Sequence, residues 1–410
     1  MPATAQLRLP TSANPIELSG TFGELCFAAD RSVALHEGPA IESAVVRAMH
    51  EPVGLPPLSR CFTQDDQIAV ALGAGVPQVD SVLRGVLTGL AEANIEPRQV
   101  TIVTATVEPT LATGLADAVD AGLRIERHDP ADEDNLCFAG VDDRDEPLRI
   151  NRRLFEADVI LPVTCGHAPG HPAAHGAYGD VYPTFGDAAA LRRLAKTNSR
   201  PTHDSDAERA GWVLGALLAL QVVPGPRGGV AQVFAGEAHE VDREAARCCQ
   251  QAWAARVDSP TSLVVITLAT DPERQTWGTL ATALDAASPL VAANGAIAVV
   301  TQLAAAPPQA LIELADADDP DHALHRLRSK NDPDLLIATS MAAALQRGPL
   351  YLLSGLSDDD VESLGMTPLC SAAESSAAEL QRLVASRPSV LLLEDAEHVV
   401  ATLAAEVVSA

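Results

Sequence analysis

The sequence predicts an α/β protein of two domains, each with a mostly parallel sheet flanked by helices. Short apolar runs rich in β-branched residues, such as 100–106 and 157–163, alternate with stretches of helical periodicity, and this alternation is typical of parallel sheets covered by helices. The chain has 410 residues, of which 47% are hydrophobic and 20% are charged. A chain of this length and composition favours two domains over one.

The first part of the chain contains the elements expected of one such domain. Residues 80–94 place Val82, Val86 and Leu90 on one helical face, and Pro52 ends the helix that precedes them. The helices are expected at 41–49, 80–94, 111–121, 188–196, 207–220 and 236–255, and the strands at 16–18, 24–27, 67–72, 100–106, 157–163 and 231–234.

The composition changes at Asp258, Ser259 and Pro260, where we place the domain boundary. We therefore expect an N-terminal domain over 1–257, a C-terminal α/β domain over 258–400 and a tail over 401–410. The second domain repeats the alternation without repeating the sequence. Its strands are expected at 263–268, 295–301, 350–354 and 389–393, and its helices at 275–288, 310–314, 323–328, 335–345 and 377–386.

Charge and cysteine content exclude several classes of function. The formal net charge is −27, so clustered basic residues for a phosphate backbone are missing and we expect no nucleic-acid partner. No apolar run of about 18 residues occurs, so no membrane span is expected. The N-terminus lacks the pattern of a signal peptide, which predicts a cytoplasmic protein. The 7 cysteines are scattered without a CxxC pair, so they indicate no disulfide framework.

The segment 161–187 is the strongest candidate for a functional loop, because it follows a strand and concentrates histidine, glycine and proline. His167, His171 and His175 are spaced by four residues, but the prolines between them argue against a helix. A looped metal site is one interpretation, with Cys165, His167, His171 and His203 as ligands. The alternative is that these histidines bind backbone groups inside a tight loop.

Several stretches, taken in order, resemble the nickel-pincer-dependent lactate racemases and related 2-hydroxy acid epimerases. The resemblance covers nearly the whole chain and depends on order and spacing. It implies two α/β domains with the active site in the cleft between them, a nickel-pincer nucleotide attached to a lysine, and histidines that hold the metal or transfer a proton. The stretches that carry it are Asp65-Asp66-Gln67, 101–110, the loop around Gly179, 234–253, 263–287 and 350–375.

The chain departs from this family at the positions that would do the chemistry. Ala69 stands where the family has the arginine that binds the substrate carboxylate. Alanine has no guanidinium group that could donate hydrogen bonds to a carboxylate. Pro109 falls where the family has a general-base histidine. The cofactor-bearing lysine has no counterpart in 178–181. Gly278 replaces a second-domain lysine, three residues after Gln275.

We therefore expect a divergent family member that binds a small ligand, such as a hydroxy acid, or a metal in the interdomain cleft and lacks the standard activity. The alternatives are a 2-hydroxy acid racemase that uses nickel-pincer hydride transfer and a metal-dependent hydrolase or lyase built on the loop. Asp65 and Asp66 form either an acid pair or a solvated turn, and Glu108 is either a substitute base or a helix N-terminal carboxylate. The candidate catalytic residues are His171, His175, Glu108 and Asp180, and the candidate ligand-binding residues are Asp65, Asp66, Gln67, Tyr178, Gly179 and Gln275.

Overall fold

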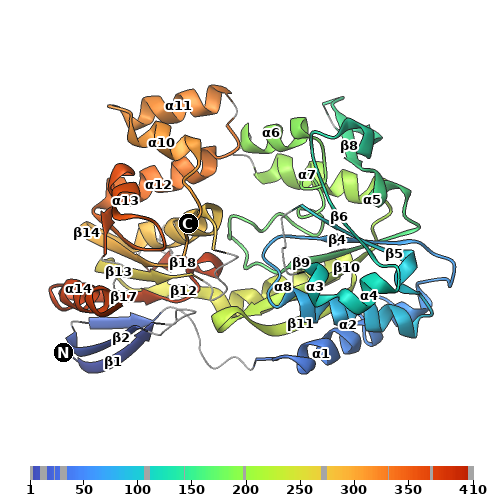
Figure 1. Cartoon of the computed structure of the whole chain (residues 1–410), viewed down its shortest axis with the longest axis horizontal. Helices are drawn as coiled ribbons and strands as arrows, with labels where there is room; N and C mark the ends of the chain where they lie inside the picture. Colours follow the sequence, from blue (N-terminus) through green and yellow to red (C-terminus); the bar gives the residue numbers. More distant parts are fainter. Residues whose placement is uncertain are drawn as a thin grey trace. The chain divides into compact units, whose positions relative to one another are not determined.

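A computed structural model of the chain describes residues 3–9, 16–22, 24–27, 35–105, 111–142, 144–196, 200–268, 275–330, 332–369 and 373–404 (Figure 1). The chain forms two compact units, and both have the predicted α/β architecture with parallel-dominated sheets. Unit 1 comprises Met1–Ser32, Pro226–Gly228 and Gln251–Ala410, and unit 2 comprises Val33–Gly225 and Gly229–Gln250.

Unit 2 contains a six-stranded sheet in the order β11-β10-β9-β4-β5-β6. Every neighbouring pair is parallel except the antiparallel pair of β10 and β11. The carboxyl ends of β4, β5, β9 and β10 therefore meet at one edge of the sheet, which is the usual position of ligands in such folds. The strand bounds are β4 Ile68–Leu72, β5 Val100–Thr104, β6 Arg124–Arg127, β9 Val159–Cys165, β10 Leu218–Gly225 and β11 Gly229–Glu237.

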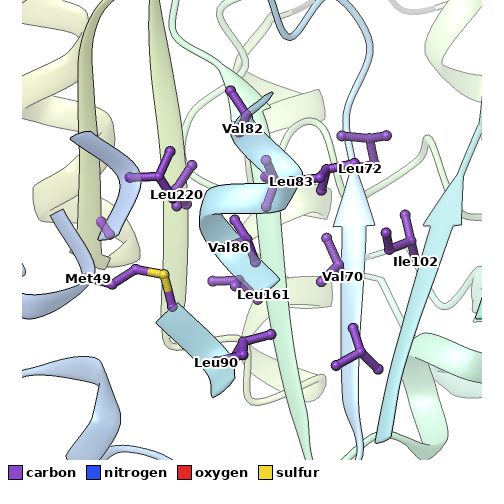
Figure 2. Close-up of a cluster of buried hydrophobic side chains, with 14 of the residues drawn as sticks. Met49, Val70, Leu72, Val82, Leu83, Val86, Leu90, Ile102, Leu161 and Leu220 are labelled. Carbon is purple, nitrogen blue, oxygen red and sulfur yellow. The ribbon is translucent and has the colours of Figure 1, made fainter. Parts of the chain in front are cut away.

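Helices cover both faces of this sheet. On one face, α1 (Pro39–His50) and α2 (Val79–Glu92) bury Met49, Val86 and Leu90 against strand residues such as Leu161, and Figure 2 shows these side chains directed toward the strands. On the other face, a second apolar cluster joins strand residues to α5 (Arg152–Glu156), α6 (Ala188–Lys196), α7 (Arg200–Val213) and α8 (Ala238–Trp253). Shorter elements complete the unit: α3 Leu111–Gly114, α4 Ala116–Asp120, and the hairpin of β7 Leu136–Val141 and β8 Pro147–Asn151.

The predicted helix at 207–220 is wrong in its second half. Helix α7 ends at Val213, Gly215 adopts a φ of 62° in the turn that follows, and β10 begins at Leu218. All residues of β10 are buried, and a short apolar run of this kind fits a buried helix and a buried strand equally well. The predicted helix at 111–121 is also divided, because α3 and α4 are separated at Leu115.

Unit 1 contains a fully parallel six-stranded sheet in the order β16-β15-β14-β13-β17-β3. Strand β3, from the beginning of the chain, forms one edge by pairing with β17. The strands are β3 Glu24–Phe27, β13 Thr261–Thr267, β14 Val291–Val300, β15 Leu350–Leu353, β16 Thr367–Pro368 and β17 Ser389–Leu393, and the helices are α9 Trp277–Ala287, α10 Gln309–Ala315, α11 Pro320–Lys330, α12 Leu335–Arg347, α13 Asp358–Ser363 and α14 Ala373–Ala385.

Two smaller strand pairs show that unit 1 is assembled from distant parts of the sequence. Strands β1 (Ala3–Leu9) and β2 (Ile16–Phe22) form an antiparallel hairpin. Strand β12 (Ala254–Val257) pairs in parallel with β18 (Val400–Leu403), so part of the segment that we expected to be a tail is a strand. Unit 1 therefore combines segments from both sides of the domain boundary that we placed near residue 257. Among the described helices, none has the length and apolar character needed to cross a membrane.

Candidate functional site

A pocket of about 260 Å³ opens at the carboxyl edge of the unit 2 sheet. The end of β9, the middle of β10, helix α8 and the histidine-rich segment 166–187, here called the histidine loop, surround it. Figure 1 labels β9, β10 and α8. It contains four residues that were predicted from sequence, namely Cys165, His167, His175 and Asp180. The other residues that line it are Pro169, Gly170, Ala173, Ala174, Gly176, Gln221, Asp242 and Ala246.

Asp180 reaches the pocket from a turn that packs against strand β4. The turn is closed by backbone hydrogen bonds from Val181 and Tyr182 to the carbonyl oxygen of Tyr178. Gly73, directly after β4, leaves the space beside Asp180: a Cβ atom at Gly73 would lie 3.4 Å from the Cβ of Asp180. Asp180 is partly exposed. Burial of its carboxyl group raises the pKa of Asp180 to about 7, and the negative charge of Asp242 adds to the shift.

Gln221 and Asp242 also line the pocket, and our sequence analysis did not identify them. Gln221 is 5% exposed, and its Nε2 donates a 3.5 Å hydrogen bond to Oδ1 of Asp242. Its Oε1 is buried and has no hydrogen-bond partner among the described residues. The sequence did contain a signal, because Gln221 is a single amide inside the apolar run of β10. This signal could be interpreted only after the run was known to be a strand.

Gln221 is placed by the register of the sheet. It pairs with Thr164 of the neighbouring strand β9, so both side chains emerge on the same face of the sheet. Further down that face lie apolar residues such as Ile160 and Ala219. Polar side chains therefore follow the apolar core on this face, near the carboxyl end of β9 and in the middle of β10.

The three loop histidines have different environments. The rings of His167 and His171 are stacked, with centroids 4.6 Å apart and an angle of 7° between the planes. His171 is 2% exposed, and its Nδ1 accepts a hydrogen bond from the backbone N–H of Ala173 at 3.1 Å. This contact agrees with the interpretation that the loop histidines bind backbone groups. His167 and His175, in contrast, line the pocket.

The predicted metal set is not assembled as a cluster within the described part of the chain. No group of three or more His, Cys, Asp or Glu side chains is arranged to hold a metal ion there. Cys165 and His167 line the pocket, whereas His171 is not among its lining residues. The side chain of His203 and the whole of Glu108 lie outside the described residues.

The turn 178–181 does not fit the lysine-attached cofactor that the resemblance implies. Tyr178 packs its ring directly on Gly211, because a Cβ atom there would lie 2.4 Å from its Cγ. A Cβ atom at Gly179 would lie 2.2 Å from the Cβ of His175, so that position has no room for any side chain. Val181 is 1% exposed within the apolar cluster. Asp180 is thus the one residue of this turn that lines the pocket.

The chain has two lysines, Lys196 and Lys330. The side chain of Lys196 lies outside the described residues. Lys330 belongs to α11 of unit 1, where its Nζ contacts Glu313 at 3.1 Å. The turn beside the pocket therefore supplies a carboxyl group where the family's chemistry requires an amine, and no step through the pincer nucleotide follows from these residues.

The remaining predicted residues are not brought to the pocket. Asp65, Asp66 and Gln67 precede β4 and lie at the amino edge of the sheet, opposite the pocket. Asp66 accepts hydrogen bonds from the N–H and hydroxyl groups of Thr63 at 2.8 and 2.5 Å, as expected for a residue that closes a turn. Gln275 belongs to unit 1, where its Oε1 accepts hydrogen bonds from Thr301 and from the backbone N–H of residue 302.

Comparison with known proteins gives a match to a family of sequences and matches to solved structures. The sequence profile of the lactate racemase N-terminal domain matches residues 28–172. The structure of the lactate racemase apoprotein from Thermoanaerobacterium thermosaccharolyticum is similar over 97% of this chain and 100% of that one, with a TM-score of 0.74 and 16% identity.

A protein from Thermotoga maritima, solved by a structural genomics consortium, is similar over 90% of this chain and 100% of its own, with a TM-score of 0.61 and 13% identity. The comparison with curated proteins finds no match. At these identities the solved structures establish the fold alone. Residues 28–172 thus match the lactate racemase N-terminal domain, and the chain as a whole has the fold of the lactate racemase apoprotein.

Proposed function

We propose that the pocket of unit 2 binds a small polar molecule and that Asp180 exchanges a proton with it. The observation that carries this proposal is the pocket that Asp180 shares with Asp242 and two histidines, where burial and the charge of Asp242 raise the pKa of Asp180 to about 7. A carboxyl group with this pKa is present in both protonation states near neutral pH, so it can donate a proton or accept one.

The reaction class that fits this group is proton transfer at carbon, as in an isomerase or a lyase. His167 and His175 line the same pocket, and an imidazole is the side chain best suited to a second proton transfer near neutral pH. A base that removes a proton and a second group that returns one are sufficient for epimerisation without a hydride carrier. The lactate racemase-like fold supports an isomerase over other uses of such a pair.

The two other functions expected from sequence receive less support. Hydride transfer through a nickel-pincer nucleotide needs an attachment lysine, and Gly179 and Val181 leave no place for one in the turn. A metal-dependent hydrolase needs a ligand cluster, and the described residues form none.

Deuterium exchange tests the proposal. Purified full-length protein is incubated in D₂O with a panel of small hydroxy acids, amino alcohols and oxo acids, and incorporation at carbon is followed by NMR. We expect incorporation into at least one compound, and at least a ~100-fold slower rate for Asp180→Asn, because general acid–base catalysis contributes that much or more. Asp120→Asn, an exposed aspartate at the end of α4, is the matched control.

Two results would count against the proposal. One is equal exchange rates for the Asp180→Asn and Asp120→Asn variants. The other is a pKa near 4 for Asp180, measured by carboxyl-carbon NMR in the ligand-free protein, since an ordinary aspartate is fully ionised at neutral pH and is a poor acid there. The second measurement needs no substrate.

A further inference from the structure

We propose that the ligand of this pocket presents an ammonium or amidinium group, which donates hydrogen bonds to Oε1 of Gln221 and to the carboxylates of Asp180 and Asp242. The inference rests on the proposed function and specifies its ligand class. It differs from what the fold family suggests, because a 2-hydroxy acid would bring a carboxylate to the same place. Three features of the pocket lead to it: an unused acceptor, the charge of its lining and the absence of a metal cluster among the described residues.

The unused acceptor is the carbonyl oxygen of the Gln221 side chain. This residue is 5% exposed and lines the pocket, yet its Oε1 has no hydrogen-bond partner among the described residues. A buried acceptor without a partner costs free energy unless a ligand or a water molecule donates to it. A ligand in the pocket that Gln221 lines could supply the donor that Oε1 lacks.

The orientation of the Gln221 amide follows from its neighbour. Its Nε2 lies 3.5 Å from Oδ1 of Asp242. If oxygen and nitrogen were exchanged, the amide oxygen would face a carboxylate, and two acceptors would repel each other. The orientation with Nε2 toward Asp242 is the favourable one, and it leaves the oxygen available for a donor.

The charge of the lining favours a cation. Asp180 and Asp242 are both in the pocket, and each raises the electrostatic cost of ionising the other. Among the described residues that line the pocket, none is Lys or Arg, and only His167 and His175 can become positive. A carboxylate ligand would meet two acids and no Lys or Arg among these lining residues, whereas an ammonium group would meet hydrogen-bond acceptors of opposite charge.

A metal ion is the other cation that two carboxylates could take. It is disfavoured because the described residues gather no third His, Cys, Asp or Glu ligand around this pair. An organic ammonium needs only hydrogen-bond acceptors. Gln221 Oε1 and the two carboxylates provide acceptors from β10, α8 and the turn that carries Asp180.

Binding of an ammonium group should be coupled to proton release. Asp180 faces Asp242 on α8, His167 and His175 on the loop, and Cys165 on β9. The carboxyl group of Asp180 holds a proton up to a pH of about 7. An ammonium group stabilises the ionised form and displaces this proton, so its affinity should rise as the pH rises from about 6 to about 8.

Three probes of similar size and different charge test the inference on the full-length protein: isopropanolamine, propylene glycol and lactate. Binding is measured by titration calorimetry at about pH 6 and about pH 8, in buffers of different ionisation enthalpy so that proton release is counted. We expect isopropanolamine to bind at least ~10-fold more tightly than propylene glycol at about pH 8, and lactate to bind more weakly than both. Proton release on isopropanolamine binding should be seen at about pH 6, where Asp180 is protonated, and should be small at about pH 8, where it is already ionised.

Two variants test whether the preference for isopropanolamine depends on residues of the pocket. Gln221→Met keeps the side-chain length and removes the acceptor, and we expect a ~10-fold loss of isopropanolamine affinity with little change for propylene glycol. Asp242→Asn should cause a loss of at least ~10-fold and a weaker pH dependence, because the shared negative charge is removed. Asp120→Asn should match the wild type.

Lactate binding as tight as that of isopropanolamine would overturn the inference, as would the absence of binding by isopropanolamine or an unchanged affinity in Gln221→Met. These failures leave the proposed function intact if Asp180 still titrates near 7 and Asp180→Asn still slows exchange at least ~100-fold. A pKa near 4 for Asp180, in contrast, removes the proposed function whichever probe binds.

Discussion

The two edges of the unit 2 sheet place the same type of residue in different surroundings. At the amino edge, Asp66 is held by two hydrogen bonds from Thr63, and Asp158 accepts one from the backbone N–H of Gln67 at 2.9 Å. At the carboxyl edge, Asp180 is packed near a second carboxylate, and its pKa is raised to about 7. The amino edge uses carboxylates to close turns and strand ends.

This difference teaches where to look for chemistry in such a sheet. A carboxylate whose oxygens accept hydrogen bonds from nearby donors is stabilised in its ionised form, so it does not readily exchange a proton. A carboxylate that is buried beside a like charge is poised to do so. The following predictions test this contrast between the edges, in order of decreasing effect.

The largest effect is expected for Asp180→Asn, because this substitution removes a group whose pKa is raised on folding. The stabilising contribution of the protonated carboxyl is complete below about pH 4 and is lost as the pH rises through about 7. Relative to the wild type, the variant should gain little at about pH 4 and about 2–4 kcal/mol in the free energy of unfolding at about pH 8.

Urea denaturation at a series of pH values measures this difference. Asp65→Asn, at the exposed amino edge, is the comparison, and it should differ from the wild type by less than about 0.5 kcal/mol at every pH. A flat difference between Asp180→Asn and the wild type across this range would mean that the two edges do not differ in the way described.

The second effect concerns the turn that presents Asp180. In Gly179→Ala, the new methyl group would meet the Cβ, carbonyl carbon and oxygen of His175 at 2.2 to 2.9 Å, and backbone atoms cannot move away easily. We expect a loss of about 3 kcal/mol in the free energy of unfolding, together with weaker ligand binding because the turn is displaced.

Thermal and chemical denaturation of this variant can be compared with Gly278→Ala in α9. The nearest atom to a Cβ at Gly278 is 3.6 Å away, so alanine fits there without a clash. That control should be neutral or should gain up to about 1 kcal/mol from its higher helix propensity. Equal stability of the two variants would contradict the close packing of the turn.

The smallest effect is expected at the amino edge itself. Asp66→Ala removes the two hydrogen bonds that the carboxylate accepts from Thr63. We expect a loss of about 1 kcal/mol in stability, with no change in deuterium exchange or probe affinity, because the residue is at the opposite end of β4 from the pocket. If Asp66→Ala slowed deuterium exchange without changing the free energy of unfolding, Asp66 would have to be considered part of the candidate site.

Much of the fold could be predicted from the sequence, because local periodicity reports local structure. The strands around 67–72 and 100–106 and the helix at 80–94 correspond to β4, β5 and α2. The wrong helix at 207–220 has a local cause: apart from Gln221, the segment that became β10 is apolar, and periodicity does not separate a strand buried on both faces from a buried helix. Missing β10 also concealed Gln221.

The candidate site was predicted only in part. The histidine loop was identified from its composition, and Cys165, His167, His175 and Asp180 do line one pocket. Asp65 and Gln275 were assigned by order along the chain, which says nothing about which end of a strand a residue occupies or which unit contains it. Asp242 is on a helix far along the sequence, and no local pattern indicated that it would approach Asp180.

The sequence by itself determined the α/β class, the position of the loop and the lack of a lysine in its turn, because these depend on composition and on short-range periodicity. Only the tertiary structure decided that Asp180, Asp242 and Gln221 share a pocket and that Asp65 lies at the opposite edge. The physical reason is that strand register and helix packing are set by contacts between residues far apart in the chain. Burial and charge around a side chain, and hence its chemistry, follow from those contacts.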